Sequence, residues 1–409
     1  MNTLPAAETS AGALRWWILA MLFACRAALG FQFQTLGSVS ESLVTGLGFS
    51  YAQVGTLIGL FMLPGLVLAL PAGYLGRLLA DRTLVSLAFF CMAGGAALAA
   101  LAQGFGLLTL GRIACGAGFV FSTIYLTKMT ADWFSGRELA TAMGILVMSW
   151  PFGIAIAQVG QTWLDLHYGW QSVFVAAALY SAFAGAALWL LYRPPAALPE
   201  ALAQQVGLQR HEWWLTLLAA LCWGLYNAGY IVYLSFAPRA LVAGGLGATQ
   251  AAAVISLASW AMIVSGALGG RVADRSGRGT PMFFLCCAVG LASLLLLQQH
   301  VAWAVPLSVL FGLAGGAPAG VIMALTGDAM APRRRAFGMG VFFSIYFLLL
   351  SAAPPVAGWL HDTSGDPWVP LRLAMLLFLG AALAFGAFKL LRRGLVATAI
   401  RTNGARPAP

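Results

Sequence analysis

Residues 266–278 read GALGGRVADRSGR, and residues 73–82 carry a shorter version of the same pattern, GYLGRLLADR. The two copies are separated by 193 positions (266 − 73). A second set of matches, from Asp132 to Gly169, recurs between Asp328 and Gly365 with an offset of 196 (328 − 132). Two nearly equal offsets indicate that the chain consists of two related halves.

The sequence around these motifs is strongly apolar. Of the 409 residues, 61% are hydrophobic and only 8% are charged. A soluble globular protein has roughly 45–50% apolar and about 25% charged residues. So few charges cannot cover the surface of a water-soluble protein of this size, which excludes a soluble enzyme, a fibrous protein and a disordered one. The chain is therefore expected to lie in a lipid bilayer.

Apolar runs separated by Gly, Pro and charged residues predict an all-α membrane protein with 12 transmembrane helices, each needing about 20 residues to cross. The predicted spans are 14–37, 50–76, 83–103, 106–131, 139–164, 170–192, 212–236, 248–271, 280–299, 302–327, 336–360 and 368–391. The longest polar interruption predicts a linker at 193–211 between two six-helix bundles. The N-terminal bundle covers 1–192, the C-terminal bundle covers 212–393, and 394–409 form a tail.

The positive charges predict the orientation. The formal net charge is +10, with 22 Lys and Arg. An even number of spans places both termini on one side, and eighteen of the cations fall there. Arg239 and Arg372 fall on the opposite side, and Arg26 and Arg112 lie inside apolar runs. Because Lys and Arg collect on the cytoplasmic side, both termini are expected in the cytoplasm of a cell with a bacterial-type inner membrane. The net positive charge is then explained by the orientation of the chain in the membrane, and no nucleic-acid partner is expected.

The two GxLxxxxADR segments resemble the loop signature of the Major Facilitator Superfamily. The second copy keeps the trailing Gly277 and Arg278, whereas the first copy departs from the pattern after Arg82. The segment from Arg112 to Gly116 is similar to the family's RxxxG motif. The resemblance covers essentially the whole chain and implies two pseudo-symmetric bundles with a solute site between them. Arg26, followed by residues 30–43 (GFQFQTLGSVSESL), is most similar to the cyanate and nitroimidazole porters of that superfamily.

The resemblance also implies a latch at the cytoplasmic ends of the second and eighth spans. In the family, each Asp of the signature lies near the N-terminus of a neighbouring helix and near basic groups. Such charge–dipole contacts are individually weak, which suits a contact that breaks in every cycle. The alternative is plain solvation of these charges in loops. The implied gating residues are Gly73, Asp81, Arg82, Gly266, Asp274, Arg275 and Arg278.

Arg26 is the strongest candidate for a binding residue. It lies 11 residues beyond Arg15 (26 − 15), about 16 Å along a helix, so it is expected near the middle of the membrane, where a charge is costly. All 12 Asp and Glu residues and all 4 His residues fall at span ends, in loops or in the N-terminal segment. An anion would satisfy the guanidinium, which is a planar bidentate donor. Alternatively, Arg26 donates to backbone carbonyls.

Further candidates lie on the same helix faces as these arginines or along the seventh span. Arg112 serves either helix packing, or ligand binding or coupling. The side chains at 223, 226, 227 and 230 follow helical spacing, which is typical either of packing or of a cavity wall with hydroxyl and amide donors. The predicted substrate-binding residues are Arg26, Phe33, Arg112, Trp223, Tyr226, Asn227 and Tyr230. Weaker candidates are Gln32, Gln34, Trp150, Gln158, Ser256, Ser259, Ser344 and Tyr346.

Together these features predict a secondary transporter that moves a small anionic solute across the inner membrane by alternating access. A multidrug or metabolite exporter of the same fold is the main alternative. A membrane enzyme or a sensor is disfavoured, because the sequence carries no HExxH, no P-loop and no soluble output domain. Without a CxxC or a Cys/His cluster, no metal or cofactor is expected. The protein is expected to act as a monomer.

Overall fold

The computed structural model describes residues 6–75, 79–134, 137–195 and 207–404, and every regular element in these ranges is a helix. Within them, 12 segments are long and apolar enough to cross a membrane. This confirms the predicted all-α fold class and the predicted number of spans. Large apolar side chains on the outside remain exposed, for example Phe183 at 73% and Leu190 at 74%. A surface of this kind suits lipid rather than water.

The N-terminal half begins at the first helix and ends before the linker. Its helices are α1 (Ala6–Ser38), α2 (Ser40–Leu47), α3 (Tyr51–Leu75), α4 (Asp81–Ala100), α5 (Phe105–Trp133), α6 (Arg137–Tyr168) and α7 (Trp170–Leu191). The short α2 lies between the predicted spans 14–37 and 50–76 and is not part of either. It is followed by Gly48, whose left-handed backbone (φ 68°) turns the chain so that the N–H of Phe49 donates to the carbonyl oxygen of Leu43 at 3.4 Å. Glycine adopts this conformation at little cost.

The C-terminal half repeats this plan with two differences from the predicted spans. Its helices are α8 (Arg210–Ala243), α9 (Ala248–Ser276), α10 (Gly279–Gln299), η1 (Val301–Trp303), α11 (Ala304–Gly316), α12 (Ala319–Ala329), η2 (Pro332–Arg334), α13 (Arg335–Ser364) and α14 (Val369–Gly404). The span predicted at 302–327 is broken between α11 and α12 at Pro318, because proline lacks the N–H that would continue the helix. Helix α14 continues past 393 to Gly404. Residues 196–206 of the predicted linker and 405–409 of the predicted tail lie outside the described residues.

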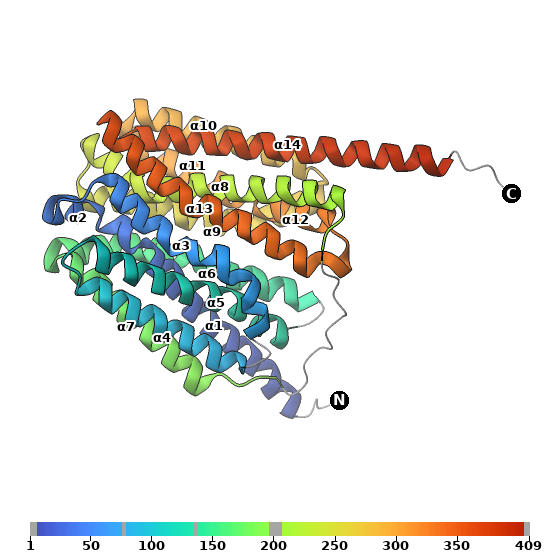
Figure 1. The fold of residues 1–409 in the computed structure, drawn as a ribbon, viewed down its shortest axis with the longest axis horizontal. Coiled ribbons are helices and arrows are strands. Elements are labelled where there is room, and N and C mark those ends of the chain that lie inside the picture. The colour runs from blue at the N-terminus through green and yellow to red at the C-terminus, as the bar shows by residue number, and fades with distance from the viewer. Residues whose placement is uncertain (1–5, 76–78, 135–136, 196–206, 405–409) are drawn as a thin grey trace.

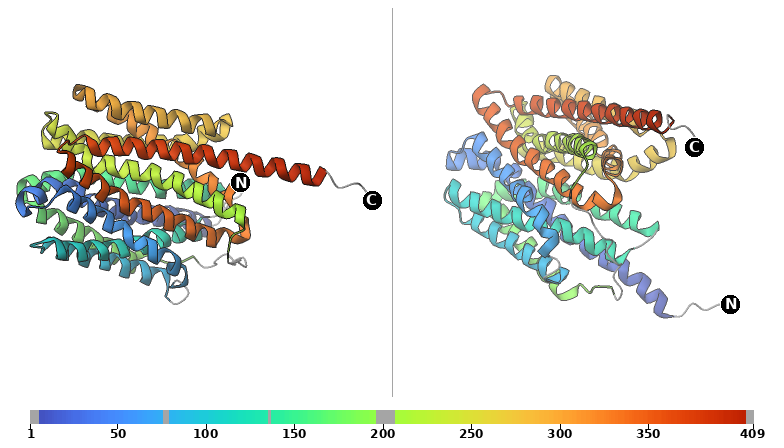
Figure 2. Two further views of the ribbon diagram at one scale, coloured as in Figure 1. Left: turned by 45° about the horizontal axis from the view of Figure 1, so that its top comes forward. Right: turned by 45° about the vertical axis from the view of Figure 1, so that its right-hand side comes forward.

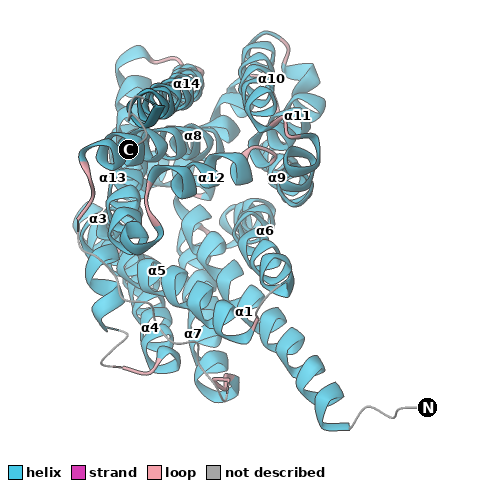
Figure 3. Ribbon diagram, turned by 90° about the vertical axis from the view of Figure 1, so that its right-hand side faces the viewer, coloured by secondary structure: helices cyan, strands magenta, loops and turns pink. Residues whose placement is uncertain are grey.

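The two halves lie side by side with their helices running along the same long direction (Figure 1). The turned views keep the blue-to-green half and the yellow-to-red half separate (Figure 2). Helix α1 begins and α14 ends at the same end of the molecule, which we call the terminal end. The opposite end, which carries Gly48 and Gly365, is called the far end. Viewed from the terminal end, the helices of each half form their own group (Figure 3).

The halves meet along two helix pairs, α3 with α13 and α6 with α9. Glycines bring the first pair into backbone contact: a Cβ added at Gly59 would lie 2.1 Å from the carbonyl oxygen of Ser351, and one added at Gly358 would lie 2.0 Å from that of Tyr51. In the second pair, the Ser256 hydroxyl donates to the carbonyl oxygen of Ala155 at 2.8 Å. In Figure 1, α3 and α13 touch near the far end and separate towards the terminal end.

Candidate functional site

Arg26 projects from α1 towards the part of α6 in which Pro151 interrupts the backbone hydrogen bonds. Its Nη1 donates to the carbonyl oxygens of Leu146 at 2.8 Å and Val147 at 3.3 Å. Pro151 lies inside α6 and has no N–H, so the carbonyl of Val147, four residues earlier, has no partner within the helix. Nη1 of Arg26 supplies the donor that this carbonyl lacks within its helix. The sequence-based alternative of donation to backbone carbonyls is therefore observed for Nη1.

Both of these hydrogen bonds are made by Nη1 and do not involve Nε of the guanidinium. Nε of Arg26 is buried and has no hydrogen-bond partner among the described residues. Within the same part of the chain, Arg26 forms no ion pair with a carboxylate. A buried N–H group normally finds an acceptor. The arginine thus keeps an unsatisfied donor at the interface between the halves.

Aromatic residues of the C-terminal half face this arginine. Tyr346 of α13 lies near Arg26 across the interface. The Tyr346 ring stacks on Trp223 of α8, with 6.3 Å between ring centroids and 20° between ring planes. One turn further along α8, Nδ2 of Asn227 donates to the carbonyl oxygen of Trp223 at 2.8 Å. Tyr346 therefore links the predicted candidates Arg26 and Trp223, although sequence reasoning ranked it as a weaker candidate.

Phe33 belongs to an aromatic cluster on the far-end side of Arg26. Its ring centroid lies 5.3 Å from that of Trp150 and 5.8 Å from that of Phe61. Phe119 joins the same cluster and reaches Phe347 of the C-terminal half at 6.4 Å. Only 2% of Phe33 is exposed. The cluster forms a packed wall that crosses the interface.

Arg112 is completely buried within the N-terminal half. Its Nε donates to the carbonyl oxygen of Leu57 at 3.2 Å, and its Nη1 donates to the carbonyl oxygen of Gln32 at 3.2 Å and to the hydroxyl of Thr35 at 3.1 Å. The guanidinium carbon also lies 4.6 Å from the centroid of the Phe61 ring. These contacts tie α5 to α1 and α3. They favour helix packing over ligand binding for Arg112.

Tyr226 and Tyr230 point into the interior of the C-terminal half. The Tyr226 hydroxyl donates to the carbonyl oxygen of Ala314 at 2.8 Å. The Tyr230 hydroxyl lies 3.3 Å from that of Ser259, and its ring stacks on Phe311. Both hydroxyls are therefore engaged with neighbouring helices. The predicted α8 residues therefore do not line one common surface. Tyr226 and Tyr230 bind α11 and α9, whereas Trp223 contacts Tyr346.

The first copy of the gating motif makes contacts within its own half. Asp81 begins α4 and forms an ion pair with Lys128 of α5, which also lies 3.2 Å from Asp132. The guanidinium carbon of Arg82 lies 5.2 Å from the ring centroid of Trp189 on α7. Gly73 lies near the end of α3. These contacts hold α4 against α5 and α7.

The second copy lies at the terminal end of α9. A Cβ added at Gly266 would lie 3.1 Å from Cε of Met148, across the interface. Arg275 is exposed in the last turn of α9, and Arg278 directly precedes α10. Asp274 lies in α9, but its side chain is outside the described part of the structure.

Charged contacts that sequence reasoning missed join the halves at the far end. Nε of Arg239 on α8 lies 3.3 Å from Oε2 of Glu41 on α2. The carboxylate of Asp362 on α13 accepts the backbone N–H groups of Tyr51 at 2.9 Å and Ala52 at 2.7 Å. An acid at a helix N-terminus satisfies free donors and complements the helix dipole. The sequence shows these charges at span ends, but their pairing depends on how the halves meet.

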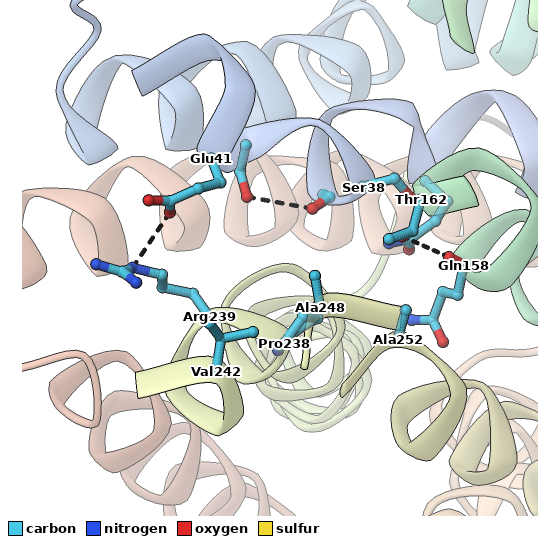
Figure 4. A pocket seen from close by; sticks show the side chains of 12 residues that line it. Ser38, Glu41, Gln158, Thr162, Pro238, Arg239, Val242, Ala248 and Ala252 are labelled. Carbon is cyan, nitrogen blue, oxygen red and sulfur yellow. Dashed lines mark hydrogen bonds and ion pairs between the residues drawn. The ribbon is translucent and has the colours of Figure 1, made fainter. Parts of the chain in front are cut away.

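A cavity of about 100 Å³ lies beside these contacts, between α1, α6, α8 and α9. Figure 4 shows Arg239 and Glu41 on one side of it and Gln158 on the other. Apolar residues, including Pro238 and Ala252, complete the lining.

Twelve spans in two pseudo-repeated halves, with a half-buried arginine at their interface, define a membrane transporter of the two-bundle type. The chain belongs to the Major Facilitator Superfamily, whose family model matches residues 22–348 and 235–407. This confirms the resemblance seen in the two GxLxxxxADR segments.

Several relatives have transporter names. The chain is 26% identical over 359 residues to the 2-nitroimidazole transporter of Escherichia coli (strain K12), covering 83% of this chain and 86% of that one. It is 31% identical over 156 residues to monocarboxylate transporter 12 of Xenopus laevis, covering 36% of this chain and 34% of that one. The chain thus spans about a third of that relative. The full-length similarity to the nitroimidazole transporter agrees with the predicted subfamily.

A solved structure confirms the fold. A bacterial homologue of the human lysosomal transporter Spinster, in an inward-facing and unoccupied conformation, superposes with a TM-score of 0.71 at 19% identity. The match covers 93% of this chain and 97% of that one. At this identity the likeness establishes the fold alone. The relatives and the fold are those of transporters and not of enzymes.

Proposed function

We propose that the protein is a secondary transporter that moves a small organic anion across a bacterial inner membrane by alternating access. The observation that carries this proposal is the unpartnered Nε of Arg26 at the interface of the halves. A carboxylate would accept from that N–H and neutralise the charge. Similarity over 185 residues, at 26% identity, to the hexuronate transporter of Escherichia coli (strain K12) supports an acidic substrate. The protein acts as a monomer.

A flat, neutral aromatic solute is the second candidate. The stacked rings of Trp223 and Tyr346 offer a face for such a molecule, next to Arg26. The full-length relative named as a 2-nitroimidazole transporter supports this alternative.

In this proposal the terminal end faces the cytoplasm and the far end faces the periplasm. The contacts of Glu41 with Arg239 and of Asp362 with α3 hold the far end together. A far end held closed by these contacts supports an inward-facing state. The gating residues of the two GxLxxxxADR copies would then close the terminal end in the other half of the cycle.

The substrate class is tested by binding and counterflow with purified protein. D-glucuronate and L-lactate are expected to raise the melting temperature, because a ligand that binds only the folded state stabilises it by mass action, and to exchange across proteoliposome membranes. Stabilisation and exchange with 2-nitroimidazole alone would contradict the anion proposal and establish the second candidate.

The orientation makes a separate prediction. Alkaline phosphatase fused after Pro409 is expected to be inactive, because this enzyme needs the oxidising periplasm for its disulfides. As a matched control, a fusion after Gly245, in the far-end turn that follows α8, is expected to be active. High activity of the Pro409 fusion, with none at Gly245, would reverse the orientation.

A further inference from the structure

The far-end cavity contains a polar side chain that the anion proposal does not use. Gln158 of α6 is 1% exposed, and both its Nε2 and its Oε1 lack a hydrogen-bond partner among the described residues. In Figure 4 its carboxamide points towards the Ala252 side of the cavity. Leaving a buried donor and a buried acceptor unpaired costs about 1–3 kcal/mol for each group. A ligand with hydroxyl groups would satisfy both at once.

Other parts of the lining favour hydroxyl chemistry over charge. The Oγ of Ser38, also in the lining, is buried and unpartnered. Nε of Arg239 has no hydrogen-bond partner among the described residues, but Arg239 forms an ion pair with Glu41, so this side of the cavity carries no excess charge. Pro238, Val242, Ala248 and Ala252 supply an apolar wall. Convergent amide and hydroxyl groups on an apolar wall suit a small molecule with hydroxyls on a carbon chain.

The cavity is separate from the Arg26 site. Gln158 follows Val147, a contact of Arg26, by 11 residues (158 − 147) on α6, about 16 Å along a helix. Phe33, Trp150 and Phe119 pack between the two levels. A small solute therefore cannot reach Arg26 and Gln158 at the same time.

We infer that the far-end cavity is a second ligand site, which binds a small hydroxyl-bearing solute through the carboxamide of Gln158 and the hydroxyl of Ser38. A volume of about 100 Å³ is several times the roughly 10–15 Å³ that one water needs. The site lies beside the ion pair of Glu41 and Arg239 that joins the halves. An occupant would therefore sit where the far end must open.

The test uses erythritol, a neutral four-carbon polyol, so its outcome does not depend on whether Arg26 binds anions. Wild-type protein is expected to bind erythritol saturably in isothermal titration calorimetry. Butane-1,4-diol, which keeps the carbon chain and lacks two hydroxyls, is expected to bind at least fivefold more weakly. Gln158→Leu is expected to weaken erythritol binding by about tenfold, equivalent to ~1.4 kcal/mol, without lowering the melting temperature.

Gln161→Leu is the matched control on the same helix. Gln161 is also buried, but its Nε2 donates to the carbonyl oxygen of Phe31 at 2.8 Å and it does not line the cavity. Its loss is expected to lower the melting temperature and to leave erythritol affinity unchanged. A lack of saturable binding in wild type, or equal affinity in wild type and Gln158→Leu, would show that the cavity holds only water and would overturn the inference.

Discussion

Arg26→Ala is expected to reduce the affinity for an organic anion such as D-glucuronate by roughly tenfold to more than a hundredfold. A hydrogen bond to a charged group contributes about 1.5–3 kcal/mol, and ~1.4 kcal/mol corresponds to a factor of ten in affinity. The melting temperature is expected to stay close to that of wild type, because two opposing effects offset each other. The variant loses the hydrogen bonds from Nη1 to the carbonyls of Leu146 and Val147, and it also loses an incompletely satisfied charge. The substitution removes a charge whose Nε has no partner in the described structure, and an uncompensated buried charge destabilises the empty protein.

Two lysine variants separate binding from packing. Arg26→Lys keeps the charge and loses the planar fork, so a bidentate site is expected to weaken clearly. Arg112→Lys is the control, because Arg112 is fully buried and its Nε and Nη1 donate to α1 and α3, although its Nη2 has no partner among the described residues. It is expected to lower the melting temperature and to change affinity little. If Arg26→Ala instead leaves affinity unchanged and sharply lowers the melting temperature, Arg26 is a packing residue and the anion proposal loses its main support.

The number and type of helices could be predicted from the sequence because each span must satisfy its backbone internally and present apolar side chains to lipid. The break at Pro318 could not be placed in the same way. Proline is tolerated inside α3, α6, α8 and α13, so its presence alone does not end a helix. A replacement donor does not decide the outcome either. The carbonyl of Ala314, four residues before Pro318, accepts from the Tyr226 hydroxyl, just as the carbonyl of Val147 in the continuous α6 accepts from Arg26.

The candidate site was predictable only in part. Arg26 could be singled out because it lies near the middle of its span and because no acid lies in the interior of any predicted span, which the sequence shows without knowledge of the packing. Tyr226 and Tyr230 share a helix with Trp223, but the rotation of α8 against its neighbours sends their hydroxyls to α11 and α9. The ties of Glu41 with Arg239 and of Asp362 with α3 join residues of different halves. No local pattern can indicate such a pairing, because it exists only in the assembled interface.

The second large effect is expected at Gly59, where the halves touch through their backbones. Pro355 lacks an N–H, so the carbonyl of Ser351, four residues earlier on α13, is free of its helix partner, and Gly59 packs directly against it. A Cβ at Gly59 would lie 2.1 Å from that oxygen and 3.2 Å from Cδ of Pro355. Gly59→Ala is therefore expected to prevent α3 and α13 from closing at the far end and to reduce transport at least tenfold.

The protein should nevertheless fold, because the clash arises between the halves and can be relieved by parting them. In an alternating-access cycle, the variant is expected to populate the state in which the far end is open. Spin labels at the exposed far-end residues Thr45 on α2 and Thr363 on α13 should then report longer distances than in the wild-type background. Gly94→Ala is the matched control within a spanning helix, because a Cβ there meets nothing within 4 Å. Normal transport and unchanged distances in Gly59→Ala would mean that the close approach of α3 and α13 is not required for transport, and that the far end does not close by this contact.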